Sequence, residues 1–237
     1  MQKVLITGTS QGSGFTIAKS FLDRGFKVIG MDVLPAPEEL SSNPNFEFYN
    51  IDVGDKYLLP DILDISYIVV NAATQDEPKC IKSNLYGYLN VCEKYAFQDT
   101  VKSVLFMGSI SAIAGIDLPM YCLTKGANRS YAKNLAMRLA PKGVLVNMLT
   151  LGPTETPMND MFLKDPQLYK DVADQNLLHK WIAPEEVAEW VYFLLVVNRS
   201  ATGSEFICDC GETASYTFVT DPETQKKYFS SRFDDII

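Results

Sequence analysis

The sequence predicts an α/β protein built on a doubly wound parallel sheet of about seven strands. Three observations favour this fold class. Short apolar runs rich in Val, Ile and Phe alternate with segments of helical period along most of the chain. The runs are apolar on both faces, as are parallel strands that helices cover on each side. A glycine-rich segment directly follows the first run, at the position of the first strand-to-helix turn.

The predicted strands and helices alternate in chain order. The strands cover residues 4–7, 27–31, 46–51, 67–71, 103–107, 144–150 and 205–208. The helices cover residues 14–24, 80–96, 120–140 and 184–196. The last helix starts at Pro184 and has Glu185 and Glu186 in its first turn, where negative charge suits the helix dipole. This β-α-β order predicts a Rossmann-like arrangement.

One domain accounts for most of the chain. The 237 residues, 47% of them apolar, are enough for a sizeable core, and no repeat or linker divides them. We expect a single domain over residues 1–211 and a C-terminal extension over residues 212–237. The extension is too short to fold alone and is expected to dock on the domain or on a neighbouring subunit. Its aromatic residues are Tyr216, Phe218, Tyr228, Phe229 and Phe233.

Charge and cysteine usage limit the possible partners and compartments. The net charge is −8, and no run of Lys and Arg occurs, so neither nucleic acid nor a membrane surface is an expected partner. Cys208 and Cys210 form a C-x-C pair without a usual zinc spacing, and His179 is the single histidine, so no metal site is expected. No signal-peptide core or stretch of about 18 apolar residues occurs. These features favour a cytoplasmic protein with reduced thiols.

The glycine-rich turn runs from Thr7 to Gly14, directly after the first strand. Glycines let the backbone turn sharply and let a pyrophosphate approach the amides, and the following helix N-terminus favours negative charge. A glycine-rich turn without a ligand is the alternative. The position at the first turn of an alternating fold favours dinucleotide binding.

Asp32 follows the second strand, 18 residues after Gly14. At about this offset a carboxylate binds the ribose hydroxyls of the adenosine half of a dinucleotide and repels a 2′-phosphate. Neither the glycine turn, with Gln11 before Gly12, nor Val33 after Asp32 offers a basic side chain. NAD is therefore predicted in preference to NADP. The alternative is an aspartate that only forms a turn.

Tyr121 and Lys125 stand near the start of the longest predicted helix. Their i, i+4 spacing places the phenol and the ammonium on one helical face. A neighbouring Lys⁺ favours the phenolate, so we expect a lowered pKa for Tyr121 and proton exchange with a substrate hydroxyl. An exposed pair on a helix face is the alternative.

These features, taken in order, resemble the single-domain short-chain dehydrogenases/reductases. Besides the glycine turn and the Tyr121/Lys125 pair, the resembling segments are Asn71-Ala72-Ala73, Asn84-Leu85-Tyr86-Gly87, Ser109, Val146-Asn147, residues 152–158, Thr202-Gly203 and Asp209-Cys210-Gly211. The resemblance covers about residues 1–211. It implies an NAD(P)-binding Rossmann domain and an oxidoreductase acting on a secondary alcohol or ketone.

The resemblance also implies a role for each matching residue. Tyr121 would be the acid-base group, and Lys125 would hold the nicotinamide ribose and lower the pKa of Tyr121. Ser109 would bond the reacting oxygen, and Asn84 would support a water through which protons reach solvent. The predicted dinucleotide-binding residues are Gly8, Ser10, Gln11, Gly12, Ser13, Gly14, Asp32, Asp52, Val53, Asn71, Ala72, Ala73, Tyr121, Lys125, Gly152, Thr154 and Thr156.

The catalytic serine has two candidates. Ser109 lies at the end of the fifth strand, 12 residues before Tyr121, where 13 is usual in the family, and Ser111 lies 10 residues before it. The strand position favours Ser109.

Two connections are shorter than the family pattern. Only 13 residues separate Asp32 from Phe46 and ten separate Ala73 from Asn84, so the crossovers after strands 2 and 4 are expected to be short. The adenine side and one wall of the active-site mouth should then be more open. Either the aromatic extension compensates or the cleft accepts a bulky substrate.

Three functions remain open from the sequence. The first is an NAD-dependent alcohol dehydrogenase or ketone reductase, the second an epimerase that holds NAD, and the third a non-catalytic NAD sensor. The four predicted catalytic residues argue against a sensor. The resemblance further implies a homodimer or homotetramer.

Overall fold

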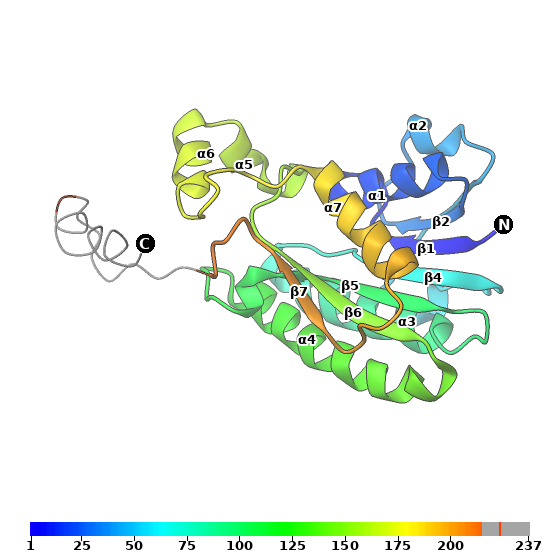
Figure 1. Cartoon of the computed structure of the whole chain (residues 1–237). Helices are drawn as coiled ribbons and strands as arrows, with labels where there is room; N and C mark the ends of the chain where they lie inside the picture. Colours follow the sequence, from blue (N-terminus) through cyan, green and yellow to red (C-terminus); the bar gives the residue numbers. More distant parts are fainter. Residues whose placement is uncertain (215–222, 224–237) are drawn as a thin grey trace.

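A single sheet of seven parallel strands forms the centre of the molecule (Figure 1). The computed structural model describes residues 1–214 and Glu223. The strands are β1 (Lys3–Thr7), β2 (Lys27–Asp32), β3 (Phe46–Asn50), β4 (Ile65–Val70), β5 (Ser103–Ser109), β6 (Leu145–Leu151) and β7 (Glu205–Cys208). Their order across the sheet is β3-β2-β1-β4-β5-β6-β7. The predicted doubly wound parallel sheet is confirmed.

Helices cover both faces of the sheet. On one face lie α1 (Gly12–Asp23) and α7 (Pro184–Tyr192), and on the other lie α3 (Gly87–Tyr95) and α4 (Pro119–Leu139) (Figure 1). Each face has its own apolar core, in which Phe21 and Val191 represent the first and Tyr95 and Leu139 the second. Burial of the strands between two apolar layers explains why they read as apolar on both faces.

The winding direction reverses between β1 and β4, which lie side by side at the centre of the sheet. Here Thr7 ends β1, and its hydroxyl accepts hydrogen bonds from the amides of Asn71 (2.9 Å) and Ala72 (3.0 Å) just beyond β4. Ligands of doubly wound sheets bind in the crevice at this point, outside the carboxyl ends of the strands.

Both predicted short crossovers are present. After β2 the chain forms only the single turn α2 (Glu38–Ser41), and after β4 a 3₁₀ turn at Glu77–Lys79 leads into the helix that carries Asn84. The connection from β3 to β4 is also short, with one 3₁₀ turn at Lys56–Leu58, which was not predicted.

Two helices predicted as continuous are interrupted by π-helical turns. Residues 80–96 form a π-helical turn at Ile81–Tyr86 followed by α3, and α7 continues from Tyr192 into a π-helical turn at Phe193–Val197. In the first case the carbonyl of Asn84 accepts a bond from the Asn128 side chain of α4 (2.8 Å). A side chain inserted into the helical ladder is a recognised cause of such an irregularity.

Two short helices lie beyond β6, at the end of the sheet where the strands finish (Figure 1). They are α5 (Asp160–Leu163) and α6 (Pro166–Ala173). The five aromatic residues of the C-terminal extension lie outside the described residues. Within the described part, no helix combines the length and apolarity needed to cross a membrane.

Candidate active site

The glycine turn between β1 and α1 lies at the point where the winding direction reverses, where a dinucleotide is expected to bind. Gly8 and Gly12 have φ values of +76° and +57°, which favour glycine. A Cβ atom on Gly14 would lie 1.8 Å from the Gly8 carbonyl oxygen, so only glycine fits there. Gln11 precedes α1 without a side-chain cap, and Ser13 lies in the first turn of α1. The first amides of α1 are not capped by a side chain, and the glycines let a ligand approach them closely. Such a helix N-terminus suits a pyrophosphate, so the residues fit a dinucleotide.

Asp32 ends β2 beside this turn, and two main-chain amides orient its carboxylate. The amide of Ser10 donates to Oδ2 and that of Leu34 donates to Oδ1, each at 2.9 Å. The Ser10 hydroxyl donates to the Leu34 carbonyl at 3.0 Å and ties the two loops together. The carboxylate is therefore fixed at the edge of the glycine turn, where the adenosine ribose was predicted.

Asn71, Ala72 and Ala73 form the opposite side of the turn. The Asn71 side chain donates to the carbonyls of Thr7 (2.9 Å) and Gly8 (3.2 Å). A Cβ atom on Gly8 would lie 2.9 Å from the Cα of Ala72, so this segment packs directly on the glycine turn.

Asp52 and Val53 follow β3, and Asp52 connects this segment to the π-helical turn. Asp52 pairs with Lys82 at 2.8 Å and accepts from the Gly54 amide at 2.8 Å. Burial opposes the charge of Asp52, but these two partners hold the pKa of the carboxyl below its usual value. Val53 is buried, and its carbonyl accepts from the Asn90 side chain at 3.0 Å.

Gly152, Thr154 and Thr156 follow β6. Gly152 packs so tightly on Asp209 that a Cβ atom would lie 2.8 Å from the Asp209 Cα. Thr154 is buried and donates to the Gly152 carbonyl at 3.0 Å. A Cβ atom on Gly12 would lie 3.2 Å from that of Thr156, so Thr156 faces the glycine turn. The predicted dinucleotide residues of β1 and β6 thus meet at one end of the sheet.

Tyr121 lies at the start of α4, with its phenol close to Ser109 at the end of β5. Burial raises the pKa of Tyr121 to about 12, although the nearby Ser109 hydroxyl opposes this rise. The predicted lowering of this pKa by Lys125 is therefore wrong for the protein as described. Loss of solvent around the phenol outweighs the other influences on its ionisation.

The two serine candidates are coupled. The hydroxyl of Ser111 donates to Oγ of Ser109 at 2.8 Å, and the Ser111 amide donates to the same atom at 3.2 Å. Ser111 is buried, whereas Ser109 is half-buried and close to the Tyr121 phenol. Ser109 thus lies beside the phenol, with Ser111 behind it.

Lys125 is buried below Tyr121, with only 3% of the residue exposed. Its Nζ donates to the Met107 carbonyl at 2.9 Å and to the hydroxyl of Tyr88 at 3.3 Å. Nζ also lies 5.6 Å from the ring centre of Tyr121. Burial lowers the pKa of Lys125 to about 8, so the ammonium is charged at neutral pH but close to its titration.

Asn84 is buried, and its polar groups have protein partners. Oδ1 accepts from the Thr74 amide at 2.8 Å, and Nδ2 donates to the Thr74 carbonyl at 2.9 Å. Nδ2 also lies 3.3 Å from the Thr124 hydroxyl. Asn84 thereby fixes the short segment that follows Ala73. Its support of a water remains a prediction.

Two residues near the catalytic group were not predicted from the sequence. Glu77 accepts hydrogen bonds from the amides of Met120 (2.8 Å) and Tyr121 (3.1 Å) at the start of α4. Tyr88 contacts Lys125, as described above. Nothing local in the sequence reveals Glu77, whereas Tyr88 lies four residues after Asn84, a spacing that places both on one helical face.

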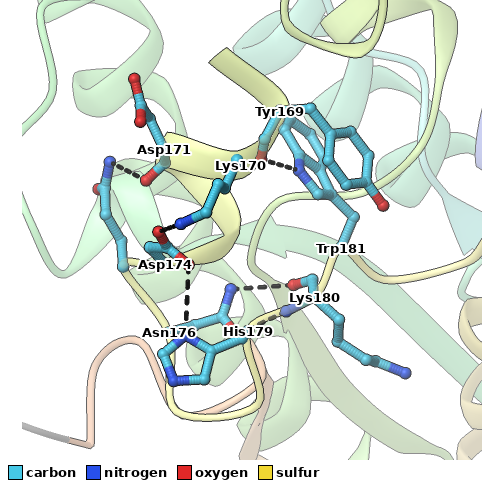
Figure 2. Close-up of polar contacts among 9 residues, drawn as sticks. Tyr169, Lys170, Asp171, Asp174, Asn176, His179, Lys180 and Trp181 are labelled. Atoms are coloured by element: carbon cyan, nitrogen blue, oxygen red, sulfur yellow. Dashed lines mark hydrogen bonds and ion pairs between the residues drawn. The ribbon is translucent and has the colours of Figure 1, made fainter. Parts of the chain in front are cut away.

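The segment from Pro153 to Trp181, which we name the lid, is held together by its own contacts (Figure 2). The Trp181 ring stacks on Tyr169 at 5.5 Å, and its Nε1 donates to the Tyr169 carbonyl at 2.9 Å. The side chain of buried Asn176 donates to the Lys180 carbonyl at 2.9 Å. His179 is exposed, with Nδ1 at 3.6 Å from the carboxylate of Asp174, the residue directly after α6. It lies on the lid surface. In the described residues no cluster of three or more His, Cys, Asp or Glu could bind a metal ion.

The chain matches a protein-family model and is similar in sequence to known reductases. A family model described as enoyl-(acyl carrier protein) reductase matches residues 63–213. Carbonyl reductase (NADPH) 2 of Sus scrofa is 25% identical over 239 residues, covering 90% of this chain and 97% of that protein. A tropinone reductase homolog of Arabidopsis thaliana is 32% identical over 122 residues, covering 51% of this chain and 40% of that protein.

Solved structures share the fold. A 4-hydroxyisoleucine dehydrogenase complexed with NADH has a TM-score of 0.81 and 20% identity, covering 91% of this chain and all of that chain. ElxO with NADP bound has a TM-score of 0.80 and 24% identity, covering 90% of this chain and 99% of that one.

Proposed function

Since the chain belongs to the short-chain dehydrogenase/reductase family, we propose that it is an NAD(H)-dependent oxidoreductase that interconverts a secondary alcohol and its ketone. The observation that carries this proposal is the packing of Tyr121 over buried Lys125, whose Nζ lies 5.6 Å from the Tyr121 ring centre, with Ser109 close to the phenol. These three residues lie at the same end of the sheet as the glycine turn and Asp32. A proton donor thus lies beside a crevice that fits a dinucleotide.

Each catalytic group has a distinct task in the proposed reaction. Ser109 donates a hydrogen bond to the carbonyl oxygen of the ketone and fixes its orientation. Tyr121, neutral at pH 7, gives its proton to the same oxygen as negative charge develops on it. The Lys125 ammonium stabilises the tyrosinate left behind. Bound nicotinamide would supply or accept the hydride at the substrate carbon.

Asp32 supports NAD as the cofactor. Its carboxylate is held by the amides of Ser10 and Leu34, and a 2′-phosphate near it would meet like charge. The test compares kcat/KM with the two cofactors for the wild type and Asp32→Ala. We expect the wild type to prefer NAD at least tenfold, and the variant to lose most of this preference. A wild-type preference for NADP would overturn the assignment.

Exposed apolar side chains near the site support an apolar substrate. They are Ile113 and Ile116, in the loop after β5, and Met158 and Met161, in the lid. The nearby cation Lys164 pairs with Asp160 at 2.6 Å, which reduces its attraction for an anionic substrate. We therefore propose secondary alcohols or ketones with an apolar body.

A panel of apolar secondary alcohols with NAD, followed by NADH absorbance, tests the reaction. The wild type should reduce NAD with at least one panel member, and Tyr121→Phe should be slower by at least about 1000-fold. NAD binding without turnover of any alcohol or ketone would contradict the proposal and favour a non-catalytic sensor.

We also propose a cytoplasmic homodimer or homotetramer. All five cysteines lie in the described part of the chain and are free thiols, which supports a reducing compartment. Light scattering measures the oligomeric state, and a monomer at micromolar concentration would contradict this expectation.

A further inference from the structure

A second tyrosine lies beneath Lys125. Tyr88 occupies the first turn of α3, and its side chain is fully buried against Phe106 of β5, with ring centres 5.8 Å apart. Its position follows from the fold, because α3 packs across the strand that ends in Ser109. A phenol hydroxyl at this depth needs a polar partner.

The Tyr88 hydroxyl has three partners. It lies within donating distance of the carbonyls of Met107 (3.1 Å) and Asn71 (3.4 Å), and it accepts from the Nζ of Lys125 at 3.3 Å. The same Nζ donates to the Met107 carbonyl at 2.9 Å. The Tyr88 hydroxyl, the Lys125 ammonium and the Met107 carbonyl form a closed triangle, so moving any one of them breaks at least two hydrogen bonds.

We propose that Tyr88 is a positioning residue that keeps the Lys125 ammonium charged and fixed below Tyr121. The inference rests on the role that the proposed function gives to Lys125. Tyr88 cannot itself act as a base near neutral pH, because burial raises its pKa well above the usual value. It serves as a neutral acceptor that favours the charged form of the lysine.

The surroundings of Lys125 leave few other groups to do this. Among the described residues, the titratable side chains that face it are Tyr88 on α3, Tyr121 on its own helix and Cys80 ahead of the π-helical turn. Burial and nearby Glu77 raise the pKa of Cys80, so this thiol is neutral. From β5 Lys125 receives only the Met107 carbonyl. No carboxylate contacts Nζ in the described structure, so the Tyr88 oxygen and one carbonyl hold the charge.

The experiment compares Tyr88→Phe with Tyr95→Phe. Tyr95 is a matched control because it lies on the same helix, is equally buried, and donates its hydroxyl to the Pro60 carbonyl away from Lys125. NMR of lysine labelled at Cε follows the Lys125 titration in the cofactor-free protein. In the wild type the midpoint is expected at about pH 8. In Tyr88→Phe it should be lower by about 1, and in Tyr95→Phe unchanged.

Activity provides a second readout. A pKa that falls from about 8 to about 7 lowers the charged fraction of Lys125 about fivefold at pH 8 and hardly at all at pH 6. The kcat/KM of Tyr88→Phe should therefore be about fivefold below wild type at pH 8 and recover at pH 6. A merely structural loss would be similar at both pH values.

Several outcomes would overturn the proposal. An unchanged Lys125 titration in Tyr88→Phe is one, and an equal change in Tyr95→Phe is another. If the wild type turns over no alcohol or ketone, the proposed function fails, but the NMR titration still decides the role of Tyr88. If Tyr88→Phe does not fold, Tyr88→Met, which also lacks the hydroxyl, is measured by the same titration.

Discussion

At the scale of single residues, replacing Ser109 and Ser111 in turn tests which hydroxyl takes part in catalysis. Ser109 lies close to the Tyr121 phenol, whereas the Ser111 hydroxyl donates to Ser109. We expect Ser109→Ala to lower kcat by about 100-fold or more, since it removes a donor to the reacting oxygen. Ser111→Ala should cost less than about fivefold, because only the orientation of Ser109 is relaxed. Steady-state kinetics of both variants decide, and the reverse ranking would assign the role to Ser111.

Buried Lys125 should lower the free energy of unfolding of the protein. Its pKa is about 8 in the folded protein against 10.5 for an exposed lysine, so burial of the ammonium costs free energy at pH 7. Lys125→Met should abolish turnover and raise the free energy of unfolding by about 1–3 kcal/mol at pH 7. Thermal denaturation measures this gain.

The gain from Lys125→Met should depend on pH with a definite sign. Between pH 8 and 10.5 the unfolded chain binds more protons than the folded one, so the wild type gains stability as pH rises. The advantage of the variant should therefore shrink from pH 7 to pH 10. Lys133→Met, which replaces an exposed lysine of the same helix, serves as the control and should change little. A Lys125→Met protein less stable than wild type at pH 7 would contradict this account.

At the scale of elements, α4 begins without a side-chain cap from its own sequence. Glu77 supplies one from the short segment after β4 through the amides of Met120 and Tyr121. Glu77→Ala should lower the free energy of unfolding by about 1 kcal/mol and reduce kcat, because the first turn of α4 carries Tyr121.

Glu77→Gln keeps one carbonyl acceptor and should restore part of both losses. Asp76→Ala is the matched control, because Asp76 is an exposed neighbour that pairs only with Lys79 in the described structure. Urea denaturation and kinetics give the two readouts. Equal effects of Glu77→Ala and Asp76→Ala would contradict a capping role.

The sequence allowed the strands and most helices to be predicted because their signals are local. β5 and β6 are buried on both faces and are therefore largely apolar. The π-helical turn around Asn84 could not be predicted, because the Asn84 carbonyl accepts a hydrogen bond from Asn128, which is 44 residues away in the chain. Contacts of this range leave no periodic trace in a single sequence.

The candidate site shows the same division. Residues at strand ends, such as Asp32 and Ser109, could be placed because the ends of parallel strands share one edge. The pKa of Tyr121 could not be predicted in direction, because its burial depends on how α4, β5 and the segment of Glu77 pack together. The contact between Tyr88 and Lys125 could not be predicted for the same reason, since the two residues are 37 positions apart in the chain.

At the scale of the whole molecule, the lid depends on one tryptophan. Trp181 is 4% exposed and stacks on Tyr169 of α6, while Trp190 on α7 is 39% exposed. Trp181→Ala should lower the free energy of local unfolding of α5 and α6 by several kcal/mol, because the packing of the ring is lost. Trypsin should then cleave at Lys164 or Lys170 at least tenfold faster. The cleavage rate is measured on the native protein, with the products identified by mass spectrometry.

The second tryptophan of the chain provides the control for the lid. Trp190→Ala should leave the cleavage rate in the lid close to wild type, because Trp190 contacts Phe193 rather than the lid. Equal acceleration in the two variants would mean that the whole domain, and not the lid, has become less stable.

The order of the strands has a consequence for how the chain can fold as it is synthesised. No strand inserts between two strands that are already paired, because β3 adds outside β2, β4 adds outside β1 at the other edge, and each strand from β5 to β7 adds outside the one before it. The glycine turn, Asp32 and Asn71 are therefore all present before Tyr121 leaves the ribosome. The part of the predicted dinucleotide site formed by the glycine turn, Asp32 and Asn71 can thus assemble on the nascent chain before the proton-transfer residues and the segment after β6 are added to it.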